Sequence, residues 1–237
     1  NIDNSLVIMC AGIKKQLGDN LDILRDNVSI INNFSNAIIK SKPAKILFIS
    51  STSVYGEDVA YSDNISEGTP VRPRTYYGIG KYTSERVLKK VCEDNKLHLM
   101  ILRPPLIYGK DDASMGYGPT GFTHKYLDRN KIILWGDGSE YREFIYVDDV
   151  VGIIDILISS DFSGIVNLVS GRSYTYIDII NKLKKITNLN IDIESRERSK
   201  EKVDHHYSNK LLNAITGNFQ FTSLEDGLNK TFKDLNN

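Results

Sequence analysis

The chain has 237 residues, of which 41% are hydrophobic and 25% are charged, and this is enough to form a packed core in one or two domains. Its 30 Lys and Arg balance 30 Asp and Glu, so the formal net charge is zero. This balance argues against nucleic acid or a membrane surface as a partner held by charge. No apolar run reaches the ~18 residues that span a bilayer.

The two cysteines, Cys10 and Cys92, exclude a disulfide framework for a chain of this size. They also lack the paired spacing that a zinc site requires, so we expect no metal centre. A reducing, cytoplasmic compartment fits this cysteine content.

Strands alternate with helices in the first half of the chain. Ser5–Ala11 is a short continuous apolar run, which predicts a buried parallel strand, and Lys45–Ser50 predicts another. Apolar residues at helical spacing predict a helix over Asp22–Lys40 between them. This alternation is typical of βα units in a parallel sheet.

Right-handed crossovers would bring the carboxyl ends of these strands, Ala11-Gly12 and Ser50–Ser53, to the same edge of the sheet. Open α/β sheets bind ligands at that edge. Small residues such as Ala11 and Gly12 permit close approach of a ligand there, although a tight turn explains them equally well.

Lys45–Lys81 is the most informative stretch. Its strand ends in the hydroxyl cluster Ser50–Ser53, and a loop leads to a helix that opens near Tyr76. Tyr77 and Lys81 are four residues apart and therefore share one helix face. A Lys ammonium beside a phenol lowers the pKa of the phenol, and a nearby hydroxyl completes a proton relay suited to alcohol oxidation or ketone reduction. Alone, the Tyr-x-x-x-Lys pair is a weak motif, and a solvated helix face is the alternative.

The run FISSTSVYGE, followed by YYGIGKYTSE, resembles the extended short-chain dehydrogenase/reductase family of nucleotide-sugar epimerases and dehydratases. The resemblance implies an α/β fold, a Rossmann-like doubly wound parallel sheet with a small α+β substrate-binding domain. It places Ser51, assisted by Thr52, at the catalytic Ser/Thr position, Tyr77 at the catalytic tyrosine and Lys81 at the lysine. It further implies NAD as cofactor, with NADP not excluded, and a nucleotide-diphosphate sugar as substrate.

Other segments extend the resemblance to the cofactor. In RDNVSIINN, Asn27 takes the place of a family Asn that packs near the nicotinamide. In LRPPLIYG, which follows the expected strand Leu97–Leu102, the resemblance makes Pro104, Pro105 and Leu106 cofactor contacts. It implies the same role for Ala11, Gly12, Ser50, Tyr77 and Lys81.

The segment YREFIYVDDVV carries the implied substrate site. Arg142 occupies the place of a family Arg that binds the diphosphate, and a guanidinium is suited to that task. A salt bridge from Arg142 to Glu143 or an Asp is the alternative. Ser51 and Ser53 are the other expected substrate contacts.

Several local features of the second half lead to further expectations. Gly116–Gly121 fits Gly-x-Gly-x-x-Gly by letter, but it does not directly follow a strand, so we expect a loop on the substrate side. A short helix is expected over Phe122–Asn130 and another over Tyr176–Thr187. Strands are expected at Ile132–Trp135, Ile165–Gly171 and Ile191–Glu194.

Two helix starts and a histidine pair complete the expectations for this half. Asp148 and Asp149 are expected to cap a helix over Val150–Ser159, rather than to bind a metal. Thr222 and Glu225 have the spacing of a capping box. The adjacent His205 and His206 point in different directions and are expected at the surface.

The expected organisation is a cofactor domain formed by residues 1–106 and about 143–168, and a substrate domain formed by about 107–142 and 169–237. The first strand resembles the fourth strand of the family pattern, so a family-like dinucleotide fingerprint of the first ~60 residues is missing. The chain is then a truncated or cleaved product, or earlier residues precede Asn1. We expect an open apolar sheet edge and poor NAD binding by the piece.

The leading functional hypothesis is a 4-epimerase of nucleotide-diphosphate sugars. Alternatives are a nucleotide-sugar 4-keto reductase and a catalytically inert binding or scaffold protein. Ser51-Thr52-Ser53 stands where the dehydratases of the family carry Thr-Asp-Glu, which argues against 4,6-dehydration. The resemblance also implies a homodimer paired through the helices at about Asp22–Lys40 and Tyr77–Asp94.

Overall fold

A four-stranded parallel sheet supports the first half of the molecule in the computed structural model, which describes residues 5–112, 116–198 and 200–236. Its strand order is β1 (Leu6–Met9), β2 (Lys45–Ile49), β3 (His98–Arg103) and β7 (Gly164–Asn167). All three neighbouring pairs are parallel. The carboxyl ends of the strands therefore meet at one edge, which confirms the Rossmann-like parallel sheet that the sequence predicts.

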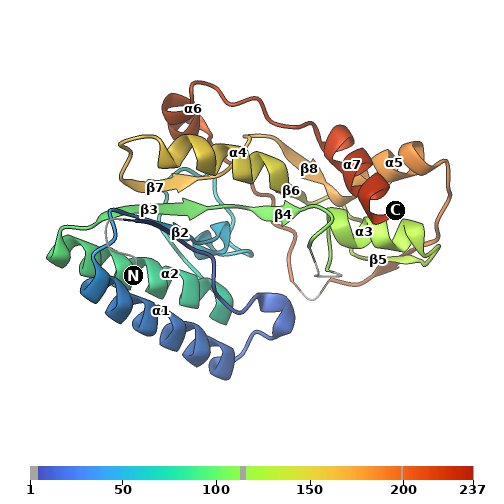
Figure 1. Ribbon diagram of the computed structural model, residues 1–237. Helices are drawn as coiled ribbons and strands as arrows, with labels where there is room; N and C mark the ends of the chain where they lie inside the picture. Colours follow the sequence, from blue (N-terminus) through green and yellow to red (C-terminus); the bar gives the residue numbers. More distant parts are fainter. Residues whose placement is uncertain (1–4, 113–115, 199, 237) are drawn as a thin grey trace.

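Helices cover both faces of this sheet (Figure 1). The helices α1 (Leu21–Ser41) and α2 (Tyr76–Asn95) lie on one face, and α4 (Val147–Ile158) and α6 (Lys210–Thr216) lie on the other. Side chains alternate along β2, so that Ile46 and Phe48 join the cluster beneath α1 and α2, while Leu47 joins the cluster beneath α4. The continuous apolar runs in the sequence reflect this burial on both sides.

Strand β1 differs from the buried strand expected at Ser5–Ala11. It lies at the end of the strand order, and Leu6 and Ile8 are 39% and 42% exposed. Only Met9 is buried. The apolar run is thus half exposed because β1 pairs with β2 alone among the described strands, and this edge is the open apolar edge that the sequence predicts.

A second group of strands and helices follows β3. The strands β4 (Leu106–Tyr108), β6 (Tyr141–Tyr146) and β8 (Ser173–Thr175) form a mixed sheet, and β5 (Ile132–Trp135) pairs in parallel with β9 (Ile193–Arg196). The helices α3 (Pro119–Leu127), α5 (Tyr176–Thr187) and α7 (Leu224–Leu235) pack against them. How the chain divides into cofactor and substrate domains stays a prediction.

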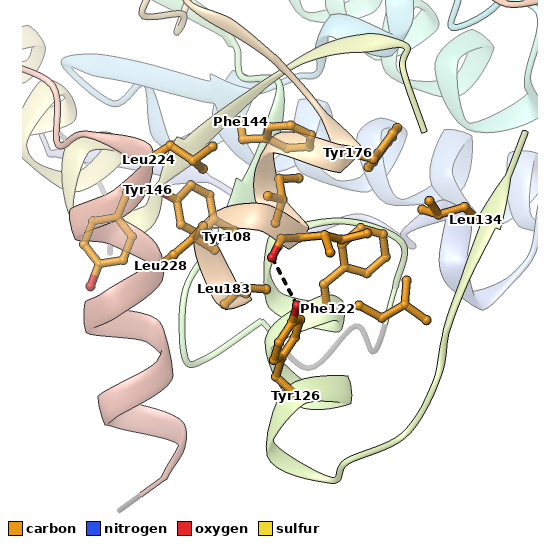
Figure 2. Packing of buried hydrophobic residues seen from close by; sticks show 13 residues of the cluster. Tyr108, Phe122, Tyr126, Leu134, Phe144, Tyr146, Tyr176, Leu183, Leu224 and Leu228 are labelled. Carbon is orange, nitrogen blue, oxygen red and sulfur yellow. Dashed lines mark hydrogen bonds between the residues drawn. The ribbon is translucent and has the colours of Figure 1, made fainter. Parts of the chain in front are cut away.

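The core of this second group is rich in aromatic rings (Figure 2). Phe144 of β6 packs edge-on against Tyr176 of α5, with ring centroids 5.8 Å apart. The hydroxyl of Tyr126 on α3 donates to the carbonyl of Ile180 at 3.1 Å, which satisfies its polar atom inside the core. Helices α3 and α5 are tied together in this way.

The expected caps of two helices are wrong, and one contact explains both. Helix α4 begins at Val147, so Asp149 lies in its first turn and does not cap it. The Asp149 carboxylate instead accepts hydrogen bonds from the backbone N–H and the hydroxyl of Thr222, at 3.0 and 2.7 Å. Thr222 is therefore unavailable as a cap, and Ser223 caps α7 by accepting from the N–H of Asp226 at 3.1 Å.

The loop expected over Gly116–Gly121 is only partly a loop. Helix α3 begins at Pro119, where a proline at the first helical position loses no hydrogen bond. Gly121 lies in that helix so close to the Gly116 carbonyl that a Cβ would sit 1.7 Å from its oxygen. The glycines of this segment thus permit close packing around the start of α3. The helix ends at Leu127, earlier than expected.

The other expected elements lie within a few residues of their predicted bounds, with β9 shifted by two residues. Two short 3₁₀ turns, η1 (Lys15–Leu17) and η2 (Thr52–Tyr55), follow the ends of β1 and β2. Cys10 and Cys92 are both free thiols. Over the described ranges, no helix is long and apolar enough to cross a membrane, and no three His, Cys, Asp or Glu side chains gather as a metal site would require.

A buried ion pair joins α2 to the end of β3. The guanidinium of Arg103 donates to both carboxylate oxygens of Glu85, at 2.9 and 2.6 Å, and both side chains are only 2% exposed. Arg103 also donates to the hydroxyl of Tyr55 at 2.8 Å, and Tyr55 donates to Asn167 at 2.9 Å. Ser50, at the end of β2, donates to Glu85. One network therefore links α2 with the carboxyl ends of β2, β3 and β7.

We predict that Arg103→Met lowers the free energy of unfolding by about 3–5 kcal/mol, because it leaves the Glu85 carboxylate buried without its partner. Urea unfolding followed by circular dichroism measures this loss. Lys89→Met is the matched control, because Lys89 and Glu93 form an exposed pair on the same helix, and its unfolding midpoint should stay nearly unchanged.

The double variant Glu85→Leu with Arg103→Met tests the cause of the loss. It should recover part of the lost stability, because neither charge is then buried alone. A double variant less stable than Arg103→Met would show that packing, and not the unpaired charge, dominates.

Candidate active site

A pocket of about 510 Å³ opens where the carboxyl ends of β2 and β3 meet the second group of strands. Most of the residues predicted from the sequence line it: Gly12, Ser50, Ser51, Thr52, Ser53, Tyr77, Lys81, Pro104, Pro105, Leu106 and Arg142. Ala11 and Asn27 border a smaller, adjoining cavity beside Gly12 and Lys81. Segments far apart in the sequence thus reach one cavity, at the edge where open α/β sheets bind ligands.

The start of α2 places Tyr77 against the hydroxyl cluster. Thr75 caps the helix by accepting from the N–H of Gly78 at 3.0 Å. At Gly78 a Cβ would lie 2.7 Å from the carbonyl oxygen of Ser53, so only glycine permits this approach. The N–H of Tyr77 donates to Asp19 at 2.9 Å. These contacts fix Tyr77 beside Ser51.

Ser51 is the hydroxyl that meets Tyr77. Its side chain shares a hydrogen bond with the Tyr77 phenol, which acts to lower the pKa of the phenol against the larger opposing effect of burial. The Ser51 oxygen also accepts from the N–H of Ser53 at 3.1 Å and caps η2. The neighbouring hydroxyls have other partners, because Thr52 bonds with Tyr207 and Ser50 donates to Glu85.

Lys81 shares the helix face of Tyr77, as the spacing predicts, but it faces the strand end. Its ammonium donates to the carbonyl of Ile49 at 2.8 Å and lies 5.9 Å from the centre of the Tyr77 ring. Burial lowers the pKa of Lys81 to about 8. An amine in this surrounding loses its charge near pH 8, well below the range of an exposed lysine.

The sequence predicts that Lys81 lowers the pKa of the Tyr77 phenol, but other groups dominate that pKa in the structure. Burial raises the pKa of Tyr77, the bond with Ser51 opposes that rise, and the negative charge of Glu57 adds to it. Desolvation disfavours the phenolate more than the surrounding groups favour it.

Arg142 lines the pocket from β6. Its guanidinium donates to two backbone carbonyls, those of Tyr141, at 2.9 Å, and Val203. The alternative partner Glu143 instead accepts from the N–H groups of Ser170 and Gly171. Asn27 is likewise bound to the backbone, because its side-chain amide exchanges two hydrogen bonds with Ile13, at 2.8 and 3.2 Å.

Comparison with protein families gives one match over most of the chain. Residues 3–168 match the model of the NAD dependent epimerase/dehydratase family. The chain belongs to this family.

Curated relatives are distant members. A putative UDP-glucose 4-epimerase of Methanocaldococcus jannaschii is 29% identical over 59% of this chain and 46% of the relative. The ADP-L-glycero-D-manno-heptose-6-epimerase of Brachyspira hyodysenteriae is 28% identical over 69% of this chain and 53% of the relative. The chain thus spans about half the length of the curated relatives it matches.

Solved structures of epimerases share the fold. The UDP-glucose 4-epimerase of Thermotoga maritima with UDP-glucose superposes with a TM-score of 0.85 at 24% identity, covering 97% of this chain and 76% of the other. The UDP-glucuronic acid 4-epimerase of Bacillus cereus in complex with NAD gives 0.86 at 22% identity, covering 97% and 74%. At this identity the likeness establishes the Rossmann-like fold alone.

The site of this family member contains residues that the sequence analysis missed. Among these additional pocket residues are Glu57, Glu143, His205 and Tyr207. His205 was expected at the surface but is 5% exposed, because its Nε2 contacts the Val59 carbonyl at 3.0 Å, and burial lowers its pKa. His206 is exposed, as expected. Glu57 directly follows the strand-end motif in the sequence, so its position could have predicted that it lines the pocket.

Glu143 is a buried carboxyl group in the pocket wall. It is 2% exposed, and burial raises its pKa to about 7 against the hydrogen bonds from Ser170 and Gly171. Its Oε1 accepts from both backbone N–H groups, and its Oε2 has no hydrogen-bond partner among the described residues. The hydrogen bonds to Oε1 therefore offset only part of the free energy that the ionised carboxylate loses when it is removed from water.

We predict that Glu143→Gln changes the pH dependence of stability. The folded-state pKa of about 7 lies above the ordinary glutamate pKa of 4.5, so the wild type loses stability as pH rises between these values, whereas the variant lacks this loss. The stability of the variant relative to wild type should rise by about 3 kcal/mol across that range. Urea unfolding at a series of pH values measures the difference. A difference independent of pH would contradict the raised pKa.

Proposed function

We propose that the whole protein is an NAD-dependent 4-epimerase of nucleotide-diphosphate sugars. The observation that carries the proposal is one pocket lined both by the Ser51–Tyr77 hydrogen bond with a buried Lys81 and by Arg142. The first group suits proton transfer at a sugar hydroxyl, and the second suits a diphosphate. Relatives named as UDP-sugar 4-epimerases support the choice of reaction and substrate class.

The pocket residues fit the nicotinamide end of the cofactor. The bare backbone of Gly12 leaves open the space that a Cβ would fill, 3.5 Å from both Lys81 Nζ and Asn27 Oδ1. Pro104, Pro105 and Leu106 line the same pocket and would contact the ring. When bound, the nicotinamide accepts a hydride from the sugar and returns it. The described residues include no Gly-rich turn between a strand and a helix for the pyrophosphate.

In the proposed reaction Tyr77 takes the proton of the sugar hydroxyl and later returns it. Ser51 hydrogen-bonds the reacting oxygen and orients it toward the phenol. Lys81, fixed by the Ile49 carbonyl, would bind the ribose of the cofactor. Arg142 would hold the diphosphate, so that the sugar can present either face while the nucleotide stays in place.

The same proton chemistry serves a 4-keto reductase, which differs by releasing the oxidised cofactor after one hydride transfer. The assay below separates the two. Conversion of UDP-hexose to its epimer without net change in cofactor absorbance supports the epimerase. Stoichiometric reduction of the supplied NAD, which is the reverse of the reductase reaction, supports the reductase. An inert scaffold gives neither.

We also propose that the protein forms a homodimer through α1 and α2. Leu21 and Ile39 of α1 and Tyr76 and Ile79 of α2 are large apolar side chains that are at least 36% exposed, and the two helices lie side by side on one face of the sheet (Figure 1). Burying such a surface against a second copy is favourable. Sedimentation at micromolar concentration should give twice the mass of one chain, and a monomer would contradict the proposal.

We predict that Tyr77→Phe lowers the epimerisation rate by about 10²–10⁴, the usual contribution of general acid–base catalysis. The assay supplies NAD with UDP- and dTDP-hexoses to the full-length protein. Tyr76→Phe is the matched control, because Tyr76 is the adjacent residue, is 40% exposed and does not line the pocket. If Tyr77→Phe turned over sugar as fast as the parent, the proposed role of Tyr77 would be wrong.

A further inference from the structure

Tyr176, the first residue of α5, is a pocket residue that the proposed reaction does not use. Its ring packs against those of Tyr117, Phe122 and Phe144, with centroids 4.4, 6.1 and 5.8 Å apart, and Figure 2 shows the last two beside it in the aromatic core. The side chain is 8% exposed and lines the pocket. Because neighbouring rings cover its own, the hydroxyl is the part of Tyr176 that can bind a ligand.

The Tyr176 hydroxyl lacks a partner within the protein. A buried tyrosine usually finds one: Tyr126 donates to the Ile180 carbonyl at 3.1 Å, and Tyr55 donates to Asn167 at 2.9 Å. The Tyr176 hydroxyl has no hydrogen bond with any described residue. Its oxygen is nevertheless not among the unpartnered atoms that are cut off from solvent. A molecule in the pocket can therefore supply the missing partner.

Arg142 is the cation beside this hydroxyl. Arg142 and Phe144 are two residues apart on β6, so both side chains project from the same face of the strand, and the Phe144 ring packs against Tyr176. Burial raises the pKa of Tyr176, and the positive charge of Arg142 is the main opposing effect. Both side chains line the pocket. A ligand bound by Arg142 thus lies next to the Tyr176 hydroxyl.

Part of the Arg142 guanidinium is free to bind an anion. Its Nη1 donates to the carbonyls of Tyr141 and Val203, which fixes the plane of the group. Its Nε and Nη2 have no partner among the described residues, and neither nitrogen is cut off from solvent. The N–H groups on Nε and Nη2 form an edge that binds a phosphate in a fork.

The acidic groups whose charges reach the Tyr176 hydroxyl already have cationic partners. These groups are Glu140 and Glu57. Glu140 pairs with Arg198, and Glu57 pairs with Lys15. Their pairing leaves the charge of the guanidinium on β6 uncompensated, which favours an anion next to the hydroxyl. Because burial raises the pKa of Tyr176, the hydroxyl keeps its proton and can donate it in a hydrogen bond.

We propose that the Tyr176 hydroxyl donates a hydrogen bond to the diphosphate of the substrate, beside the Arg142 guanidinium. The inference rests on the proposed function, which assigns that diphosphate to Arg142. An ionised phosphate oxygen only accepts hydrogen bonds and is attracted by the cation, whereas a neutral sugar hydroxyl gains little from the charge. Tyr176 is thus a binding residue and takes no part in the proton transfer at Tyr77.

The binding test uses Tyr176→Phe, which removes the hydroxyl and keeps the ring among its aromatic neighbours. In titration calorimetry of the full-length protein with UDP and dTDP, we expect Kd to rise about tenfold, because a hydrogen bond to a charged group is lost. Tyr174→Phe is the matched control, since Tyr174 lies on the adjoining β8 and does not line the pocket. A Kd for Tyr176→Phe within about twofold of the parent value would overturn the proposal.

Two further measurements identify the group that the hydroxyl binds. The ³¹P NMR resonances of bound UDP should differ between the parent and Tyr176→Phe, and should coincide between the parent and Tyr174→Phe. Weaker UDP binding with unchanged ³¹P resonances would assign the hydroxyl to the nucleoside and overturn the proposal. NAD also carries a pyrophosphate, so its Kd should be the same in the parent and Tyr176→Phe. A loss of affinity for NAD in place of UDP would be equally contrary.

Stability separates a binding role from a structural one. Because the Tyr176 hydroxyl has no partner in the described chain, its removal should leave the urea unfolding midpoint unchanged or slightly higher. Tyr126→Phe provides the contrast, because it removes the bond to Ile180 and should unfold at a lower urea concentration. A midpoint lowered as much in Tyr176→Phe as in Tyr126→Phe would reveal a structural bond and overturn the proposal.

Kinetics with UDP-hexose and NAD separate this inference from the proposed function. Tyr176→Phe should raise KM about tenfold and leave kcat within about twofold, because the bond to the diphosphate is made equally in the ground state and the transition state. A lower kcat with unchanged KM would contradict this role. If Tyr77→Phe stays active, the proposed chemistry fails while the UDP titration still tests Tyr176. If Tyr77→Phe is inactive and Tyr176→Phe binds UDP as the parent does, this inference alone fails.

Discussion

The buried pair of Glu85 and Arg103 is the constraint on which the site depends. Tyr77, Lys81 and Glu85 are spaced four residues apart on α2, so the face that carries the phenol and the amine also carries the carboxylate that binds β3. Ser50 adds the end of β2 to the same carboxylate. Any rotation of α2 about its axis would break charge-assisted bonds in a dry interior, where their loss costs most. The positions of Tyr77 and Lys81 follow from this anchoring.

Burial sets the electrostatic character of the site. It raises the pKa of Tyr77 and lowers that of Lys81, so both groups are driven toward their neutral forms. The same effect raises the pKa of Glu143, which lines the pocket from β6. A cofactor or substrate that carries charge would shift these equilibria strongly.

Features that depend on local pattern were predictable from the sequence, and features that depend on distant contacts were not. Two local patterns were sufficient for part of the structure. The continuous apolar runs of β2 and β3 predicted the buried strands of the sheet, and the spacing of Tyr77 and Lys81 predicted that both lie on one helix face in the site. The bond between Asp149 and Thr222 joins residues 73 positions apart, and it overrode two cap patterns that were locally sound. The burial of His205 depends likewise on Val59. Nothing near these residues in the sequence signals such partners.

The two prolines after Arg103 explain why the pocket lies where it does. Proline has no N–H to donate, so a central strand cannot continue through Pro104 and Pro105. The chain leaves the parallel sheet at Arg103 and enters the second sheet at Leu106. The Pro104 carbonyl still accepts from the N–H of Thr52, at 2.9 Å, which holds the hydroxyl cluster against the break. The interruption of one strand therefore creates the junction between the two sheets, and the proton-transfer groups and Arg142 meet across it.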